Sequence, residues 1–512
     1  MYRYRIHEIK LGANEDKSAI PDRIKKKLRI QSEITHYKIV KESLDARDKG
    51  DIKYVYTVDF HTNTQIPGLS EAPEISYKYP IKGALQMKER PVIAGFGPCG
   101  MFAALILSEL GYAPVILERG KRVEERVKDV EAFWNEGILN EESNVQFGEG
   151  GAGTFSDGKL TTGIKDSRVR KVLEELARAG AGDDILYKQK PHIGTDMLRK
   201  TVKNIREKII KNGGEIMFGA RLCGITAEKN KLTAVKVRDE NGCKEIYTEN
   251  LILATGHSAR DTIRELYKAG LFMEQKPFSI GIRIEHPQEL INEAQYGKNA
   301  ARGLPPAEYK LSGVCKDKRG VYTFCMCPGG EVIVASSQKG GIVTNGMSDR
   351  ARAGKYANSA VLVDVKTSDF ESEDPLAGIL FQEKYEKTAY EKAGGKYRAP
   401  QTSWAEFAGG DLNALPVISS LPEFAVNGVR EAMPYFGKKL KNFDSPDAKI
   451  YAVESRSSSP VRIKRDESFQ SNIAGVYPGG EGAGYAGGIM SAAADGIKIA
   501  EEIIKKFRNI GT

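Results

Sequence analysis

The chain contains 512 residues, more than one ordinary hydrophobic core holds, and this length predicts two or three domains. Hydrophobic residues make up 40% and charged residues 28% of the chain, and together with 53 glycines they are typical of a soluble globular α/β protein. No apolar run reaches the roughly 20 residues that cross a bilayer, and the first residues lack the pattern of a secretory signal. The composition therefore excludes membrane-spanning helices and predicts a cytoplasmic protein, with a moderate net charge of +9.

The six cysteines are scattered and imply no disulfide framework. No two of them have the CxxC spacing of a zinc ribbon or of a thioredoxin-like pair, and no CxxCxxC run offers an iron–sulfur site. We predict no metal site. The cysteines are Cys99, Cys223, Cys243, Cys315, Cys325 and Cys327.

Residues 1–65 are predicted to form a small α+β domain. The apolar pattern predicts a strand over 2–11, a helix over 21–30, and a hairpin across the turn "DKGD". This βαββ order is expected of a small ferredoxin-like domain. Residues 66–89, with three prolines, are predicted to be an extended linker.

The segment "RIKKKLRI" (23–30) is the densest basic patch in this domain. Such a patch can bind nucleic acid. Ile24, Leu28 and Ile30 interrupt the basic residues, however, so the pattern favours the solvated face of an amphipathic helix. We keep a flavin-dependent RNA-binding or RNA-modifying protein as an alternative, although a nucleic-acid partner is not the favoured interpretation.

Residues 90–120 predict a strand, a glycine turn, a helix and a second strand, which together form a βαβ unit. In "GFGPCG", Gly95 allows the tight turn, Gly97 lets a pyrophosphate approach the backbone, and Gly100 lets helix and strand pack closely. Glu118 ends the second strand, where an acid binds the ribose of the adenosine. Pro98, Cys99 and Arg119 complete the predicted nucleotide contacts. The helix N-terminus lowers the pKa of a thiol at Cys99, although we interpret this cysteine as a packing residue.

Two later segments favour FAD over NAD. "LILATG" is a buried strand that returns the chain to the nucleotide at Gly256 after a β-meander. The C-terminal stretch 475–488 carries an acid, Glu481, followed by a glycine loop that opens a helix. This layout resembles the FAD-binding superfamily typified by glutathione reductase. The resemblance implies that Glu481 binds the pyrophosphate–ribityl region, although aspartate is usual there, and that the last helix faces the isoalloxazine. The residues implied at this end are Gly480, Glu481, Gly487, Gly488 and Ile489.

The predicted fold is therefore a Rossmann-like FAD-binding domain, a parallel sheet with a β-meander, built from residues 90–276 and 455–512. An α+β substrate domain, residues 277–454, is inserted between the two parts.

The loop 147–163 is a further glycine-rich segment next to the nucleotide domain, and its bare backbone allows close approach to the flavin. A positive group near the flavin N1 stabilises the reduced, anionic ring, which makes Lys159 a catalytic candidate. The residues predicted to contact the cofactor here are Gly150, Gly151, Gly153, Thr154, Gly158, Lys159 and Leu160.

Five motifs in order carry a closer resemblance over nearly the whole chain: "GGAGTFSDGKLTT", "CMCPGGEVIVASS", "NGMSDRARAGKYANSAVLV", "SRSSSPVRI" and "GGEGAGYAGGIMSAAADGI". They resemble a largely uncharacterised family of bacterial FAD-dependent dehydrogenases with an extra N-terminal domain. The chain is more distantly similar to geranylgeranyl-reductase-type and aminoacetone-oxidase-type flavoproteins. The resemblance implies the fold and FAD; it supplies no substrate.

Three further residues are catalytic candidates. Arg456 precedes the last FAD motif, where a guanidinium can bind an anionic or carbonyl-bearing substrate; a loop joining the domains is the equal alternative. Cys325 and Cys327 share one side if their segment is a strand. They are either a dithiol relay to the flavin or, as we favour, two buried packing thiols, because a CxC disulfide is strained.

We therefore expect an FAD-dependent oxidoreductase with non-covalent FAD, in which hydride moves at flavin N5 between the cofactor and a small molecule. No second glycine fingerprint is present, so no full nicotinamide domain is expected. Two alternatives stay open: NADH or NADPH reduces the flavin as a transient donor, or electrons come from the substrate and leave to oxygen, a quinone or a carrier protein. A flavoprotein that senses redox state through Cys325 and Cys327 is a third hypothesis. The sequence leaves substrate and oligomeric state open.

Overall fold

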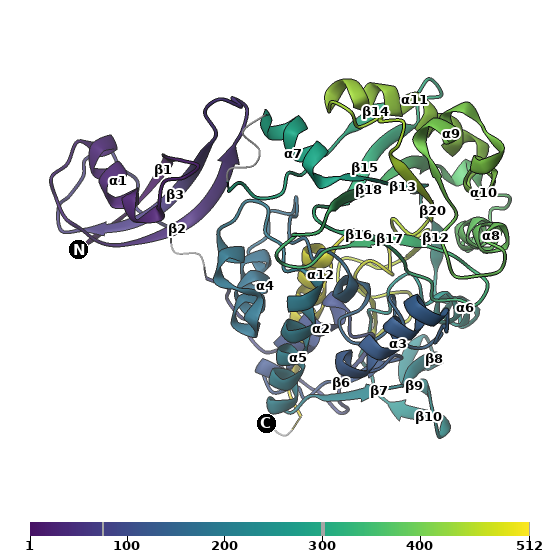
Figure 1. Ribbon diagram of the computed structural model, residues 1–512. Helices are drawn as coiled ribbons and strands as arrows, with labels where there is room; N and C mark the ends of the chain where they lie inside the picture. Colours follow the sequence, from purple (N-terminus) through teal and green to yellow (C-terminus); the bar gives the residue numbers. More distant parts are fainter. Residues whose placement is uncertain (74–75, 298–302, 511–512) are drawn as a thin grey trace.

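The computed structural model describes residues 1–73, 76–297 and 303–510. The N-terminal sheet lies to one side of a larger body, and that body combines a parallel sheet with an antiparallel one (Figure 1). Among the described residues, no helix has both the length and the apolar character required to cross a membrane.

The N-terminal part contains β1 (Tyr2–Gly12), α1 (Ile20–Leu28), β2 (Ile34–Asp45) and β3 (Lys53–Thr62). The strands form an antiparallel sheet in the order β1-β3-β2, which is the expected βαββ sequence of elements. Ile20 and Ile24 are fully buried, whereas Lys26 and Lys27 on the other face of α1 are exposed, so the helix is amphipathic.

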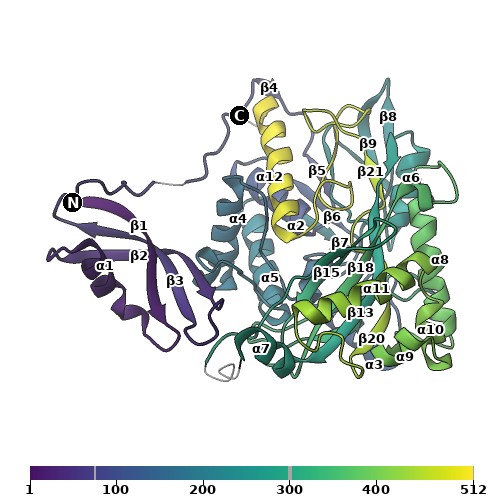
Figure 2. The same cartoon turned by 90° about the horizontal axis from the view of Figure 1, so that it is seen from above.

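The described part of the linker contains no helix or strand before β4 (Leu85–Gln86), which pairs in parallel with the C-terminal β23 (Phe507–Arg508). Figure 2 shows β4 beside the end of α12 (Ile489–Lys506). Tyr77 donates a hydrogen bond to Glu501 at 2.8 Å, which attaches the linker to this helix.

A five-stranded parallel sheet forms the centre of the body, in the order β22-β11-β5-β6-β7. Its alternate residues enter two different cores: Ile93 and Ile252 pack under helices, whereas Val92 and Leu251 pack against the meander. Burial on both faces explains why these strands are continuous apolar runs. The strands are β5 (Val92–Ala94), β6 (Val115–Glu118), β7 (Glu215–Phe218), β11 (Leu251–Leu253) and β22 (Val476–Pro478).

Helices α2 and α12 pack tightly beside this sheet because small residues separate them. A Cβ on Gly496 would lie 2.0 Å from the Cys99 carbonyl oxygen. The helices of this region are α2 (Pro98–Glu109), α3 (Val123–Glu136), α4 (Arg168–Leu176), α5 (Thr195–Lys211), α6 (Arg260–Lys268) and α12 (Ile489–Lys506). The strands of the meander are β8 (Arg221–Glu228), β9 (Lys231–Asp239) and β10 (Gly242–Tyr247).

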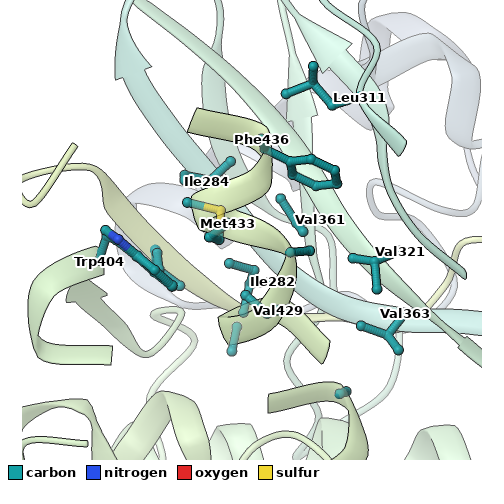
Figure 3. Close-up of a cluster of buried hydrophobic side chains, with 14 of the residues drawn as sticks. Ile282, Ile284, Leu311, Val321, Val361, Val363, Trp404, Val429, Met433 and Phe436 are labelled. Atoms are coloured by element: carbon teal, nitrogen blue, oxygen red, sulfur yellow. The ribbon is translucent and has the colours of Figure 1, made fainter. Parts of the chain in front are cut away.

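A six-stranded sheet in the order β14-β15-β18-β13-β20-β19 makes up most of the region between the two nucleotide segments. Helix α11 (Glu423–Lys439) lies across it, and Figure 3 shows Val429, Met433 and Phe436 of this helix beside Ile282 and Val361 of the sheet. The strands are β13 (Phe278–Pro287), β14 (Ser312–Val314), β15 (Gly320–Cys327), β18 (Tyr356–Val365), β19 (Gln401–Ser403) and β20 (Lys449–Glu454).

Two small sheets join these parts. β12 (Met273–Gln275) pairs with β21 (Val461–Ile463), so the segments entering and leaving the six-stranded sheet lie side by side. β16 (Glu331–Val334) pairs with β17 (Thr344–Met347). The remaining helices are α7 (Gln288–Tyr296), α8 (Ala377–Lys392), α9 (Trp404–Gly409) and α10 (Leu415–Ile418).

Candidate functional site

A cavity of about 450 Å³ lies between the carboxyl ends of the parallel strands and residues of β15, β17 and β20. This is the position at which open α/β sheets bind ligands. Sixteen of the predicted cofactor residues line it: Gly95, Gly97, Pro98, Cys99, Glu118, Arg119, Gly151, Gly153, Gly158, Lys159, Gly256, Gly480, Glu481, Gly487, Gly488 and Ile489.

Four other predicted cofactor residues, all in the described chain, lie behind the cavity wall. A Cβ on Gly100 would lie 1.9 Å from the Gly95 carbonyl oxygen, so Gly100 packs α2 on its strand. Gly150 has a φ of +82° and Thr154 donates a hydrogen bond to the Glu149 carbonyl at 3.0 Å, so both shape the loop. Leu160 belongs to the hydrophobic core.

Backbone forms the wall at the start of α2. Gly95 has a φ of +101°, and a Cβ there would lie 2.3 Å from the Ala254 carbonyl oxygen. A Cβ on Gly97 would meet nothing closer than the Gly151 Cα at 3.8 Å, so Gly97 keeps this end of the cavity open. The first turn of the helix therefore presents its N–H groups to the cavity, as a phosphate-binding helix does.

Cys99 differs from one expectation. Its thiol is buried between α2 and the Gly479–Gly480 backbone, and burial raises its pKa well above the usual value instead of the helix N-terminus lowering it. The interpretation of Cys99 as a packing residue agrees with this position.

Glu118 is buried and accepts backbone hydrogen bonds from Phe96, Gly120 and Gly148, each at 2.9 Å. A carboxylate offers about four acceptor positions, so one remains for a hydroxyl group in the cavity. Arg119 stacks over the Phe147 ring at 4.0 Å and pairs with Asp261 at 2.9 Å, so its side chain is a fixed part of the wall.

The loop that follows is held by Arg126, which we did not predict. This fully buried guanidinium on α3 donates hydrogen bonds to four carbonyls, those of Asn144, Val145, Glu149 and Gly151. Burial lowers its pKa to about 10. An arginine within an amphipathic helix pattern gives no sign in the sequence that it will be buried.

Glu481 and His257 meet at the cavity. The His257 Nδ1 lies 2.5 Å from the Glu481 Oε2, whereas the buried Glu481 Oε1 and His257 Nε2 have no hydrogen-bond partner among the described residues. Buried polar atoms normally have a hydrogen-bond partner, so these two atoms indicate that a polar ligand binds in the cavity. The open backbone at Gly97, Gly256 and Gly488 provides the room. The residues present therefore fit a dinucleotide.

Lys159 lines the cavity and forms an ion pair with Asp157. Asp157 also accepts hydrogen bonds from Arg352, at 2.8 and 2.5 Å, and from Ser348. Two cations thus hold the pKa of Asp157 well below its usual range, and Asp157 raises the pKa of Lys159. The lysine stays charged at the cavity wall.

Arg456 lines the cavity but has no free donor for a substrate. All five of its N–H groups have a partner: Glu386 accepts two bonds, at 3.1 and 2.8 Å, and Ser258, Ser337 and Gln338 accept one each. Of the two alternatives for Arg456, this geometry favours the hydrogen-bonded loop that joins the domains. Arg260 shares the same glutamate, so the cluster joins three separate segments.

The opposite end of the cavity is formed by side chains of the six-stranded sheet and its neighbours: Phe324, Cys325, Thr344, Asn345 and Glu454. Arg283, fully buried on β13, donates to Glu454 at 2.9 Å and to the Cys325 carbonyl at 2.7 Å. Burial raises the pKa of Glu454 to about 7 despite this ion pair. Neither Arg283 nor Glu454 was predicted, because charged residues in strands ordinarily face solvent.

Cys325 departs from the predicted strand geometry. The pairing of β15 with β18 shifts register between Phe324 and Cys327, and Cys325 has a φ of +44°. The two cysteines therefore do not share one side of a regular strand: Cys325 lines the cavity, and Cys327 is buried behind it.

Comparison with known proteins agrees with this geometry. Residues 277–457 match the family described as FAD-dependent protein, C-terminal domain-like, and residues 3–61 match a domain of unknown function. An uncharacterized protein of Clostridium beijerinckii is 46% identical over 98% of this chain and 99% of its own.

Several solved flavoprotein structures are similar at low identity. The flavin-dependent brominase Bmp2 is 12% identical with a TM-score of 0.39, covering 80% of this chain and 77% of its own. A geranylgeranyl bacteriochlorophyll reductase-like protein of Thermoplasma acidophilum is 12% identical with a TM-score of 0.36, covering 81% and 78%. Glycine oxidase from Bacillus cereus is 11% identical with a TM-score of 0.36, covering 81% and 95%.

Proposed function

Because the chain belongs to a family of FAD-dependent proteins together with its clostridial relative, we propose that it is an FAD-dependent oxidoreductase acting on a small molecule. The observation that carries this proposal is the cavity itself. One end is bare backbone with unpaired buried polar atoms, and the other end carries charged side chains.

The residues that line the cavity indicate which of them would hold each part of FAD. Glu118 has one acceptor position left for the adenosine ribose, and the N–H groups at Gly97 and Cys99 face the pyrophosphate position. Glu481, with its unpaired Oε1, would bind the pyrophosphate–ribityl region. The backbone at Gly488 and in the 151–158 loop would adjoin the isoalloxazine. When bound, FAD supplies a two-electron centre that takes or gives hydride at N5.

The chain's own residues supply charge and protons around that position. Lys159 holds a positive charge at the wall, because Asp157 stabilises its ammonium. Glu454, with a pKa of about 7, is able to hold or release a proton near neutral pH, as a general acid or base must. Arg283 and Thr344 fix the two Glu454 oxygens, at 2.9 and 3.0 Å.

The electron donor is proposed to be NADH or NADPH, visiting the same cavity. We propose no nucleic-acid role, because the exposed lysines of α1 are those expected on the solvent face of an amphipathic helix.

Anaerobic mixing of the purified protein with NADH and with NADPH tests the proposal through the absorbance of oxidised flavin. Rapid bleaching by either one supports a reductase that uses this donor. If the protein is yellow but neither nicotinamide bleaches it, the proposal of an oxidoreductase stands, and the substrate is then the electron donor. A colourless protein that takes up no added FAD contradicts the proposal.

A further inference from the structure

Cys325 and Cys327 stand at the substrate end of the cavity. Cys325 is partly exposed and lines the wall, and Cys327 is completely buried directly behind it. The Cys327 thiol donates a hydrogen bond to the Cys325 carbonyl at 3.4 Å and lies within hydrogen-bonding reach of the Cys325 sulfur. An accessible thiol therefore has a second, protected thiol beside it.

The backbone between the two cysteines is not that of a regular strand. In a regular strand, Cα atoms two residues apart lie about 6.6 Å from each other, near the roughly 6.8 Å upper limit of disulfides. The bulge after Phe324 and the φ of +44° at Cys325 replace this regular geometry, and the Cys327 thiol lies close enough to the Cys325 backbone to donate to its carbonyl at 3.4 Å. A non-glycine residue in the left-handed region is uncommon, and such residues concentrate at functional sites.

Two cations surround the pair. The Arg283 Nη2 contacts the Cys327 sulfur at 3.5 Å, and Lys159 adds its charge from the neighbouring loop. Together with the Cys327 hydrogen bond, they lower the pKa of Cys325, while the Cys327 pKa is raised. The exposed sulfur is thus the one that ionises first.

We propose that Cys325 and Cys327 form a redox-active pair that exchanges two electrons with a small disulfide in the cavity. The Cys325 thiolate attacks one sulfur of the substrate, whose S–S bond breaks, and the other sulfur leaves as a thiolate. The deprotonated Cys327 then attacks the Cys325 sulfur and releases the second substrate thiolate. The pair is oxidised by two electrons, the substrate is reduced by two, and the two cysteine protons end on the released thiols.

This inference rests on the proposed function at one point. Restoring the dithiol requires two electrons and two protons. Bound flavin in its reduced, anionic form would supply the two electrons and one proton, and the second proton would come from solvent. Cys325 lines the cavity in which that flavin would lie.

The test is anaerobic incubation of the purified holoprotein with oxidised glutathione, followed by alkylation and peptide mapping by mass. We expect a Cys325–Cys327 disulfide in the wild type. Cys327→Ser is expected to trap glutathione on Cys325, whereas Cys325→Ser is expected to leave Cys327 alkylated and free of glutathione. Wild-type protein in which both thiols are alkylated after the incubation would overturn the proposal, as would Cys327→Ser that traps nothing.

Cys315→Ser is the matched control, because this thiol is buried in the same part of the chain and is not among the residues that line the cavity. It should leave the disulfide yield unchanged. A reductive titration adds a second readout: pre-oxidised wild type should consume about two more electrons per chain than Cys325→Ser. The flavin content of the same samples separates the two proposals, since a yellow protein without the disulfide contradicts only this one.

Discussion

The two ends of the cavity are built by different means. The end proposed to hold the nucleotide consists of backbone from glycine turns with two acids, Glu118, which three N–H groups satisfy, and Glu481. The end proposed to hold the substrate consists of charged side chains, and nearly every charge there is buried against an opposite one. A wall made of backbone adds little free-energy cost to folding once the glycine turn has formed. A wall of buried charges depends on each partner remaining in place.

This contrast predicts that substitutions at the substrate end destabilise the fold, whereas those at the glycines of the nucleotide end chiefly weaken cofactor binding. Glu118, a buried acid at the nucleotide end, should show both effects. Each variant below tests one side of it.

Glu386→Gln should have the largest effect, because Glu386 is the shared buried partner of Arg260 and Arg456. Removing its charge leaves the buried Arg456 guanidinium without a paired carboxylate and leaves Arg260 with only Glu383, at 3.8 Å. We therefore expect a loss of about 3–5 kcal/mol in the free energy of unfolding. Urea unfolding measures this. Glu265→Gln is the control, since Glu265 is 47% exposed where it pairs with Lys268 and should cost about 1 kcal/mol or less. Equal losses for the two would contradict the comparison.

Gly97→Val should weaken FAD binding at least 100-fold, about 2.7 kcal/mol, with little change in stability. The backbone at Gly97 is extended and a Cβ has 3.8 Å of clearance, so the fold accepts valine while its methyl groups fill the cavity. Flavin content and FAD titration of the apoprotein check this. Gly163→Val, on an exposed loop with nothing near its Cβ, should bind FAD normally.

Glu118→Gln should cost about 1–3 kcal/mol in stability and also weaken FAD binding. Glutamine keeps one acceptor oxygen, so its amide would face the N–H of Phe96 or of Gly148. Urea unfolding and FAD titration measure the two effects. Glu142→Gln, whose carboxylate is 47% exposed, should change neither by a comparable amount. Unchanged stability in Glu118→Gln would show that the nucleotide end needs no buried acid.

Glu454→Gln should change the pH dependence of stability. The pKa of Glu454 is raised from 4.5 to about 7, so between these values the folded protein keeps a proton that the unfolded chain releases. Its stabilising contribution is complete below pH 4.5 and is lost as pH rises through 7, with a slope of up to about 1.4 kcal/mol per pH unit. The variant should lack this part of the slope in urea unfolding between pH 5 and 8. Identical slopes for both proteins would contradict it.

Glu149, which burial also raises to a pKa of about 7, keeps its own contribution in both proteins. The difference between wild type and variant therefore isolates Glu454.

Much of the nucleotide end could be predicted because its signals are local. Gly95, Gly97 and Glu118 lie within one βαβ unit, where strand, turn and helix periodicities fix their relation to each other. The substrate end could not, because its residues come from strands far apart in the sequence. Glu454 and Arg283 are neighbours only through the pairing of β13 with β20. Arg456 was noticed for its charge, but its partner Glu386 lies 70 residues away on α8.

The sequence by itself determined the glycine turns, the apolar strands and the return of the C-terminal segment to the nucleotide, because each depends on backbone conformation and periodicity. Only the tertiary structure decided which buried charges are paired and which polar atoms remain unpaired in the cavity. It also decided that a bulge in β15 turns Cys325 toward the cavity. Burial and pairing depend on what packs opposite a residue, and the chain supplies that partner from a distant segment.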